Sequence, residues 1–312
     1  MVYAEPVYVP PPLPPDRECL RWTWHGVDGS TWLLGRAAGA YLLRTAVAGL
    51  LLPAFSDAAT ASPRVAGQFY RSTRTLPRHL SFTVRTRAET SRDWLEIHRS
   101  WWRSWSPYEA GVLEVASVAG VRTLPMRLQS SGDQAFEADP SRWAMLTHEL
   151  DAVADDPFWR GQPVERSWST APPVLFYGES GYGPPFYISQ ASVIDGATID
   201  NPGDEDTWPV WTVEATAPTT DVHLTVAGGT ITLPDLQAGQ AIRVDTHPAL
   251  GGSQRGAMVD GEFVASELDI DGLLDVYDAR RLPAGESVPV GIAMTGAGSV
   301  SLSFTPRYWM AF

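Results

Sequence analysis

The sequence predicts a mainly β protein in two domains: a first β domain that carries one helix, and a second domain folded as a β-sandwich. The 312 residues include 13 Trp, 27 Gly and 26 Pro, a composition rich in strand-forming and turn-forming residues. Short runs that alternate apolar with polar residues recur between turn signals. Only one segment shows a helical period, and the length suffices for two hydrophobic cores.

The second domain begins its strand-dense part at a turn, Asn201-Pro202-Gly203-Asp204, because Gly and Asn or Asp favour chain reversal. The apolar and turn patterns after it predict a strand at 208–215, a hairpin of 222–226 with 230–233 joined by Gly228-Gly229, a turn at 236–240 and a strand at 241–246. The strand at 208–215 has apolar residues on both faces, so we expect its start to be buried on both sides.

The rest of the second domain contains the strongest hairpin dipeptide of the chain, Asp260-Gly261, within the segment 257–264. Two further strands are predicted at 287–294 and 299–306. The segment from Tyr187 onward therefore holds about eight or nine short strands, a number typical of a jelly-roll or galectin-like sandwich.

The first domain opens with strands at 20–25 and 31–34 around the turn Asp28-Gly29-Ser30. Alternating segments predict a long hairpin of 65–71 with 80–87 around the turn-prone 75–79, a second hairpin of 111–116 with 120–128, and a strand at 143–154. The next segment, 162–185, is rich in Pro, Gly and Ser. We therefore expect a domain at 1–161, a linker or crossover at 162–185 and a sandwich at 186–312.

The one predicted helix begins at a cap, Thr90 or Ser91, and Asp93 and Glu96 suit its positive end. Pro107 limits its C-terminal extent. One face is formed by large apolar residues at helical spacing: Trp94, Ile97, Trp101 and Trp105. Such a stripe could be an aromatic cage for a sugar, but core packing is the commoner role and is the interpretation adopted here.

Charge and cysteine content limit the possible partners. The chain has 23 Arg and Lys against 36 Asp and Glu, a net charge of −13, which argues against a protein that grips nucleic-acid phosphates. Its single cysteine, Cys19, allows neither an intramolecular disulfide nor a four-thiolate zinc site. We therefore expect folding in a reducing cytosol. The proline-rich segment 1–15 is unlike a secretory signal, and the apolar run 46–55 is too short to span a membrane.

The proline run at 7–15, VYVPPPLPP, could bind a partner domain as a polyproline ligand. An extended leader that lies on its own domain or on a neighbouring subunit is the interpretation favoured here.

No catalytic, cofactor or metal site is predicted. The segment Gly178-Glu179-Ser180-Gly181-Tyr182-Gly183 resembles a nucleophile elbow, but Tyr182 occupies the position that requires glycine. The six histidines show no metal-binding spacing: His25, His79, His98, His148, His223 and His247. The run 269–275 lacks the full calcium-loop pattern, and it is interpreted, like Asp204-Glu205-Asp206, as a solvated acidic loop. A spatial pair of catalytic carboxylates stays open, because sequence does not display distances.

The order of motifs along the chain resembles that of siphophage distal tail proteins, especially those of phages that infect actinobacteria. In the second domain the matching positions are Asn201, Gly203, Asp204, Trp208-Pro209-Val210-Trp211, Gly229-Thr230-Ile231, Leu236, Gly239, Ile242, Asp245-Thr246 and Pro306-Arg307-Tyr308. In the first domain they are Trp24 to Leu34, Ala46 to Pro53 and Asp156-Pro157-Phe158-Trp159-Arg160-Gly161. One departure is the segment Glu214-Ala215-Thr216, where the family usually has a glycine.

The resemblance implies a structural, non-enzymatic virion protein at the distal tail tip or baseplate, made in the host cytoplasm. It implies a homo-hexameric ring adaptor with the first domains as the ring, or belt, and the second domains outside it. The implied partners are the tail tube protein, the tape measure protein, and the tail hub, tail-associated, receptor-binding and fibre proteins. DNA would pass through the lumen without specific binding, and no membrane, cofactor or metal is implied.

Two other functions stay open at this stage. A galectin-like sandwich can be a carbohydrate-binding module that aids attachment to a host surface, and a jelly-roll can carry a glycosidase site. The overall acidity suggests a lumen that repels the DNA backbone. A concentration of arginines in the first domain stands against that idea: Arg36, Arg44, Arg64, Arg71, Arg74, Arg78, Arg85 and Arg87. They are interpreted as solvated strand positions or subunit contacts.

Overall fold

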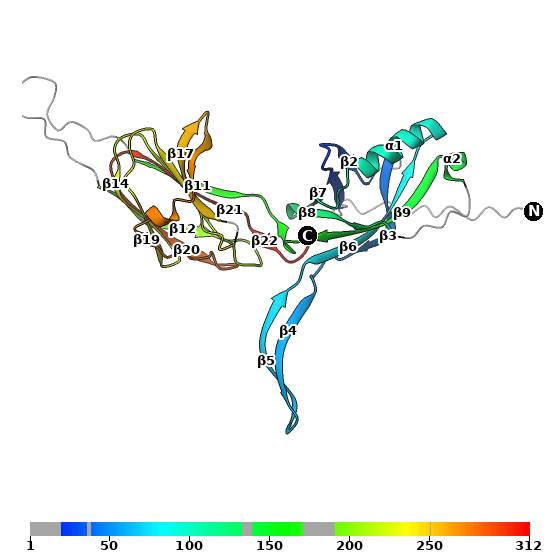
Figure 1. Ribbon diagram of the computed structural model, residues 1–312, viewed down its shortest axis with the longest axis horizontal. Coiled ribbons are helices and arrows are strands. Elements are labelled where there is room, and N and C mark those ends of the chain that lie inside the picture. Colours follow the sequence, from blue (N-terminus) through cyan, green and yellow to red (C-terminus); the bar gives the residue numbers. More distant parts are fainter. Residues whose placement is uncertain (1–19, 36–38, 133–138, 171–190, 250) are drawn as a thin grey trace, which may run out of the picture. The chain divides into compact units, whose positions relative to one another are not determined.

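The computed structural model describes residues 20–35, 39–132, 139–170, 191–249 and 251–312. The contacts within the chain divide it into two units, which are described separately (Figure 1). Unit 1 is Met1–Trp159 together with Trp309–Phe312, and unit 2 is Arg160–Tyr308. The polypeptide therefore passes from one unit to the other twice.

Unit 1 is a strongly curved sheet with one long helix against it. Its elements are β1 (Arg21–His25), β2 (Thr31–Leu33), β3 (Gly39–Ala48), β4 (Phe55–Ser62), β5 (Val65–Thr75), β6 (Arg78–Arg87), α1 (Ser91–Arg103), β7 (Gly111–Ser117), β8 (Gly120–Ser130), α2 (Pro140–Trp143) and β9 (Met145–Ala154). The main sheet has the order β2-β1-β7-β8-β9-β6-β3. Leu42 of β3 donates its N–H to Leu34, just after β2, over 2.9 Å. The sheet thus nearly closes on itself.

The predicted long hairpin of 65–71 with 80–87 is wrong in its pairing, although both strands exist. β5 pairs with β4, whereas β6 pairs with β3 and β9. The physical reason lies in the burial patterns. β6 alternates buried with accessible residues and must place its apolar set on the core, whereas every described residue of β4 and β5 is at least partly accessible. β4 was missed because its sequence, FSDAATAS, has no apolar alternation.

The predicted helix and its core role are confirmed. The side chain of Thr90 caps α1 by accepting the N–H of Asp93, and the helix ends at Arg103, before the predicted stop at Pro107. Trp94 and Trp101 are buried on its inner face, and Trp105, just beyond the helix, stacks on Trp24 with ring centroids 3.8 Å apart. These tryptophans form the core of unit 1, so they are not an exposed sugar cage.

The predicted strand at 143–154 begins later than expected. Residues 140–143 form the short helix α2, and Ala144 follows in the left-handed conformation with φ 46°. β9 therefore starts at Met145.

Unit 2 is a sandwich of two antiparallel sheets, as predicted. Its elements are β11 (Val164–Thr170), β12 (Ala191–Asp200), β13 (Val210–Ala215), β14 (Thr220–Val226), β15 (Gly229–Leu233), β16 (Ala241–Asp245), β17 (Gly252–Val259), β18 (Glu262–Leu268), the 3-10 turn η1 (Asp271–Leu273), β19 (Val276–Tyr277), β20 (Ser287–Thr295) and β21 (Gly298–Phe304). One sheet has the order β11-β21-β13-β16-β17-β18 and the other β12-β20-β14-β15-β19. The short strands β10 (Trp159–Arg160) and β22 (Arg307–Tyr308) lie where the chain passes between the units.

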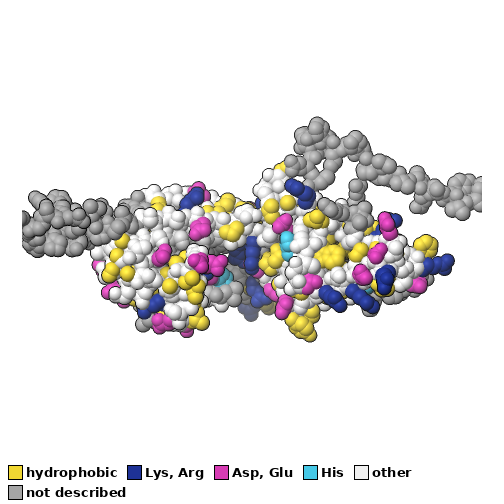
Figure 2. Space-filling view, turned by 90° about the horizontal axis from the view of Figure 1, so that it is seen from above, with side chains coloured by type: hydrophobic (Ala, Val, Ile, Leu, Met, Phe, Trp, Pro, Cys, Tyr) yellow, Lys and Arg dark blue, Asp and Glu magenta, His cyan; other side chains and the backbone are white. Residues whose placement is uncertain are grey.

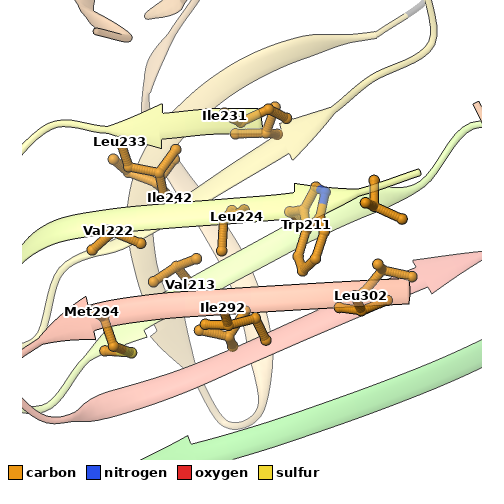
Figure 3. Close-up of a cluster of buried hydrophobic side chains, with 14 of the residues drawn as sticks. Trp211, Val213, Val222, Leu224, Ile231, Leu233, Ile242, Ile292, Met294 and Leu302 are labelled. Atoms are coloured by element: carbon orange, nitrogen blue, oxygen red, sulfur yellow. The ribbon is translucent and has the colours of Figure 1, made fainter. Parts of the chain in front are cut away.

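The two sheets enclose a single apolar core (Figure 3). Trp211 and Val213 of β13 are fully buried and face Leu224 and Ile292 from the other sheet. β13 begins at Val210 and alternates half-buried with buried residues, so it is buried on one face and only partly on the other. Pro209 continues the buried face, whereas Trp208, on the other face, is only half-buried, so the prediction of burial on both sides is wrong.

The turn predicted at 201–204 is anchored by a buried asparagine. The side-chain amide of Asn201 donates to the carbonyls of Glu205 (3.2 Å), Leu282 (3.1 Å) and Pro283 (3.2 Å), and its oxygen accepts the N–H of Gly203 (3.0 Å). A Cβ on Gly203 would lie 2.8 Å from the carbonyl oxygen of Arg307, so only glycine fits there. One side chain thus joins two chain segments of unit 2, 201–205 and 282–283.

The predicted domain limits differ from the units that the structure shows. The predicted linker 162–185 begins with a strand, since β11 pairs with β21 along its whole length, from Val164↔Phe304 to Thr170↔Gly298. The rest of that linker lies in 171–190, outside the described residues. The last four residues, predicted to end the sandwich domain, belong instead to unit 1.

Candidate functional site

The most distinctive surface feature is the ribbon of β4 and β5, which leaves the rest of unit 1 as a separate two-stranded sheet (Figure 1). It pairs from Phe55↔Thr75 to Ser62↔Val65. Phe69 and Tyr70 are 56% and 65% exposed. An isolated two-stranded ribbon is at best marginally stable in water. This ribbon therefore has the properties of an element that becomes ordered against a partner.

Side chains along the ribbon are small and polar over most of its length, and two side-chain hydrogen bonds join its strands among those described. Arg71 donates Nε to the Thr60 hydroxyl over 3.2 Å, and the Thr73 hydroxyl donates to Asp57. The strand β4 consists mainly of Ala, Ser and Thr. Small side chains let another backbone approach closely, and the consecutive residues Phe69 and Tyr70 add one exposed aromatic side chain to each face of the ribbon.

The base of the ribbon is held by Arg78, the most buried charged residue described, at 1% exposure. Its guanidinium donates to four backbone carbonyls, those of Gly49 (2.6 Å), Leu51 (2.9 Å), Pro157 (2.6 Å) and Trp309 (2.6 Å). Burial lowers the pKa of Arg78 to about 10, which still leaves it charged at neutral pH. A guanidinium has five donors and no acceptor, so it suits a site lined by carbonyl oxygens.

The C-terminal segment of the chain closes the same site. The ring of Trp309 packs against Phe55, at the start of the ribbon, and against Phe158, with ring centroids 5.7 and 4.9 Å away. Ala311 donates its N–H to Leu50 over 3.2 Å. The ribbon's base is therefore fixed by residues far apart in the sequence, from Gly49 to Ala311, and no sequence pattern indicated this.

The sheet face opposite α1 is polar and nearly balanced in charge. β6 and β9 pair Ser81 with Asp151, Thr83 with Glu149 and Arg85 with Thr147 on this face. An open hollow of about 380 Å³ lies over it. The Ser130 hydroxyl donates to Asp151 over 2.7 Å, and Arg85 donates to Thr147 over 3.0 Å. The face is thus rich in hydroxyls, with carboxylates and arginines both present.

The arginines predicted to cluster are spread over different parts of unit 1. Arg64, Arg71 and Arg74 lie on or beside the ribbon, Arg78 is buried at its base, and Arg85 and Arg87 lie on β6. Arg36 and the side chain of Arg44 lie outside the described residues. The described members therefore include one structural residue, one group on the ribbon and a pair on β6, in place of a single basic patch.

The net charge is distributed very unevenly between the units. Unit 1 contains 16 arginines and 17 acidic side chains, a net charge of −1, whereas unit 2 contains 7 arginines and 19 acidic side chains, a net charge of −12. Figure 2 shows acidic and basic side chains scattered over one face of the molecule. The expectation of an acidic lumen rested on the charge of the whole chain, and unit 1 does not carry that charge.

Two of the histidines that are distant in sequence meet in the core of unit 1. The rings of His98, on α1, and His148, on β9, have centroids 5.0 Å apart. His148 is 2% exposed and lies 3.3 Å from the Thr86 hydroxyl, which also accepts the indole N–H of Trp94. Burial, and secondarily the neighbouring His98, lowers the pKa of His148 to about 4, and burial lowers that of His98. Sequence spacing could not show this pair.

The other features weighed in the sequence do not converge in the described residues. Among these, no three His, Cys, Asp or Glu side chains come together in a way that could hold a metal ion. The acidic run 269–275 contains η1 and an accessible loop. The Gly178–Gly183 segment, Cys19 and the proline run 7–15 lie outside the described residues. Within the described ranges no helix is long and apolar enough to cross a membrane.

The two units together define a class of protein by their architecture: a curved sheet with a projecting ribbon, followed by a β-sandwich. No known family profile matches the sequence, and no curated protein matches it. Among solved structures, the Dit protein of phage SPP1, described as a paradigm of the hub adsorption apparatus in phages infecting Gram-positive bacteria, has 14% identity and a TM-score of 0.60. The match covers 93% of this chain and 99% of that one.

A second match is a chain of the phage P2 baseplate in its activated conformation with Ca. It has 11% identity and a TM-score of 0.54, and the match covers 93% of this chain and 98% of that one. The same baseplate with Sr gives the same identity and TM-score over 92% and 98%. The predicted resemblance to siphophage distal tail proteins is confirmed at the level of the fold, over both units.

Proposed function

We propose that this chain is a structural protein of a phage tail tip, a hexameric ring adaptor between the tail tube and the baseplate. The observation that carries the proposal is the match of both units, nearly end to end, to the fold of a phage hub protein. The role is structural and not enzymatic. The protein would be made in the host cytoplasm and would act in the virion at the distal tail tip.

The β4–β5 ribbon is the element that joins neighbouring subunits in this proposal. A closed ring built by head-to-tail contacts requires two different complementary surfaces on each subunit. The ribbon supplies one of them, because it is nearly fully accessible, carries exposed Phe69 and Tyr70, and is fixed at its base by Arg78. The complementary surface lies on unit 1 of the neighbour, which completes the ring.

The polar sheet face opposite α1 lines the lumen in this proposal. Its hydroxyl groups, from residues such as Ser81 and Thr83, interact with water, and Glu149 and Asp151 offset Arg85 and Arg87. A face without net positive charge does not release counterions from DNA, so DNA and the tape measure protein can pass without binding. This balance replaces the acidic lumen expected from the sequence.

Unit 2, with its net charge of −12, lies outside the ring in this proposal and contacts the hub, tail-associated, receptor-binding or fibre proteins. The tail tube protein binds the opposite side of the ring.

The test is the symmetry of the purified chain, alone and with its tube partner, by negative-stain class averages. Six-fold rings with a central hole support the proposal. A monomer in both settings overturns it, and hydrolysis of a host polysaccharide would show a glycosidase.

A further inference from the structure

The end of the β17–β18 hairpin is a second projecting element, and it differs chemically from the ribbon. β16 pairs with β17 only between Gly252 and Gly256, so within the described ranges the hairpin beyond that point has no neighbouring strand in its own sheet. We call residues 257–264 the hairpin tip. It contains four large apolar side chains around the turn, of which two are about half exposed: Met258, Val259 (51%), Phe263 and Val264 (52%).

The tip presents these apolar side chains on both of its faces. Ala257 pairs with Val264 on one face, and Met258 pairs with Phe263 on the other. A sheet edge exposed to water normally keeps one face polar. The sequence therefore places apolar side chains where the unit itself gains little from burying them, and this favours burial by a partner.

The outer edge of β18 offers backbone groups for pairing. Asp260 and Gly261 both have positive φ, 52° and 84°, as a type I′ turn requires. The pair Val259↔Glu262 that closes such a turn exchanges hydrogen bonds, so the ladder alternates from there. Phe263 and Ala265 consequently direct their N–H and C=O groups away from β17, and among the described residues no strand pairs with that edge.

Charge determines which strand can pair there. Glu262 and Glu267 are exposed on β18, and Asp260 lies at the turn. Glu267 has one arginine near it, Arg255, at 3.8 Å. Two copies of β18 side by side would bring carboxylates together, which disfavours pairing between copies of this chain. The excess of acidic residues in unit 2 likewise favours a basic partner.

We propose that the β17–β18 tip is a docking site for an extended, basic segment of a different protein, which adds a strand beside β18. Apolar and β-branched side chains of that segment cover Phe263 and Val264, and its arginines or lysines lie near Glu262 and Glu267. Strand addition of this kind combines main-chain hydrogen bonds with side-chain specificity. The inference does not depend on ring formation, since every group involved lies in unit 2.

The test uses an array of twelve-residue peptides that alternate Val, Ile or Thr with Arg or Lys, probed with the full-length chain. Two matched arrays replace every basic residue by Glu, or place Pro in the centre. The expected result is binding to the basic array, at least tenfold above both controls. Equal binding to the acidic or the proline array, or no binding to the basic array, overturns the proposal.

A variant separates strand addition from simple attraction between charges. The Ala265→Pro substitution removes an N–H that points away from β17, where proline is tolerated in edge strands, and it blocks the added strand. We expect it to weaken binding of the best basic peptide at least tenfold, as measured by fluorescence anisotropy, with an unchanged thermal midpoint. Binding that survives in this variant contradicts strand addition.

A charge-reversal pair keeps the proposal testable if that variant misfolds. In the doubly substituted chain, Glu262→Lys with Glu267→Lys, we expect the preference to invert, so that the acidic array binds better than the basic one.

Hydrogen exchange locates the bound peptide on the wild-type protein. Binding of the best peptide should slow the exchange of the amide hydrogens of Phe263 and Ala265 at least tenfold. Protection confined to other strands would overturn the assignment.

Discussion

Each unit of the molecule is tied together by one buried polar side chain, but the two side chains differ in charge. In unit 1, Arg78 donates to four carbonyls, which come from the segment before the ribbon, the end of the domain and the C-terminal segment. In unit 2, the neutral amide of Asn201 donates to three carbonyls. A hydrogen bond to a charged group contributes about 1.5–3 kcal/mol, more than the roughly 0.5–1.5 kcal/mol of a bond between neutral groups. The comparison therefore predicts that unit 1 is the more sensitive to loss of its polar anchor.

The interiors differ in the same way. Unit 1 buries a titratable imidazole, that of His148, among its tryptophans, whereas the buried polar side chains described in unit 2 are Asn, Thr and Ser residues around the apolar core at Trp211. Those side chains do not titrate, so the interior of unit 2 should tolerate changes of pH. The ribbon at which we place the subunit contact depends on the unit with the titratable interior. The following predictions test this contrast.

The largest effect is expected for Arg78→Met. The substitution keeps side-chain volume but leaves the four carbonyls, including those of Gly49 and Trp309, without their donor. A buried carbonyl left without a donor costs about 1–3 kcal/mol, so we expect a total loss of at least about 3 kcal/mol. Urea denaturation followed by circular dichroism measures the loss in the transition of unit 1.

The matched control for Arg78 is Arg87→Met, on the same strand β6 but exposed. Exposed substitutions of this kind change stability by about 0.5 kcal/mol or less. Equal effects of the two substitutions would show that the Arg78 bonds do not hold the ribbon's base.

The second effect is a loss of stability of unit 1 in acid. His148 in the folded chain has a pKa of about 4, whereas in the unfolded chain it titrates near the usual 6.5. The unfolded state therefore binds a proton first as pH falls. The stability contribution is complete above pH 6.5, declines between 6.5 and 4, and amounts to about 2–3 kcal/mol.

Carboxylates also titrate at the lower end of this range, so the measured quantity is a difference between two proteins. We expect His148→Leu to have a shallower decline of unfolding free energy between pH 6.5 and 5 than the wild type. Val84→Ala, at the cross-strand partner of His148, removes no titrating group, so it serves as the control and should leave the slope unchanged. Identical slopes for His148→Leu and the wild type would contradict the assignment.

A smaller effect is expected at Asn201. The Asn201→Ala substitution removes the two N–H donors that three carbonyls share, and one acceptor, and should cost about 1–3 kcal/mol. Asn201→Asp keeps the acceptor for Gly203 but places a carboxylate against three carbonyl oxygens, so it should be at least as destabilising. A milder effect of Asn201→Asp than of Asn201→Ala, in the same denaturation experiment, would exclude the donor role.

The smallest effect is expected for a backbone cut within 171–190, at an engineered protease site. From the sequence, cleavage in the predicted linker 162–185 would release a separate C-terminal domain. The structure predicts otherwise, because β11 stays paired with β21 and Trp309–Phe312 belongs to unit 1. The cut chain should elute as one species under native conditions and as two fragments in denaturant. Separation under native conditions would contradict the division into units.

Apolar alternation and turn residues predicted which segments form strands, turns and the helix better than they predicted which strands pair. The turn at Asn201, the hairpin at Asp260-Gly261 and the helix stripe of Trp94 and Trp101 were predicted because each depends on neighbouring residues in the sequence. The ribbon was missed because β4 carries no apolar alternation, which is what a strand without a core face should look like. The pairing of β5 failed for the same reason.

The site itself depends on contacts between distant residues, which sequence spacing does not encode. Arg78 was indistinguishable from its seven neighbours in the arginine-rich region, although it alone is buried against carbonyls from Gly49 to Trp309. His98 and His148 are likewise 50 residues apart and meet only through the packing of α1 on the sheet. The uneven charge of the two units became visible only once their boundaries were known.

The central claim, that the β4–β5 ribbon closes a ring, is tested most directly by the mass in solution of two shortened chains. In the first, Asn-Gly replaces residues 57–73, so that the pair Ser56↔Arg74 flanks a two-residue turn. In the second, the control, Asn-Gly replaces 258–263 between Ala257 and Val264. Light scattering should give a ring of about 200 kDa for the wild type and the control, six times the 34.0 kDa chain, and a folded monomer without the ribbon. A ring of unchanged mass without the ribbon would contradict the claim.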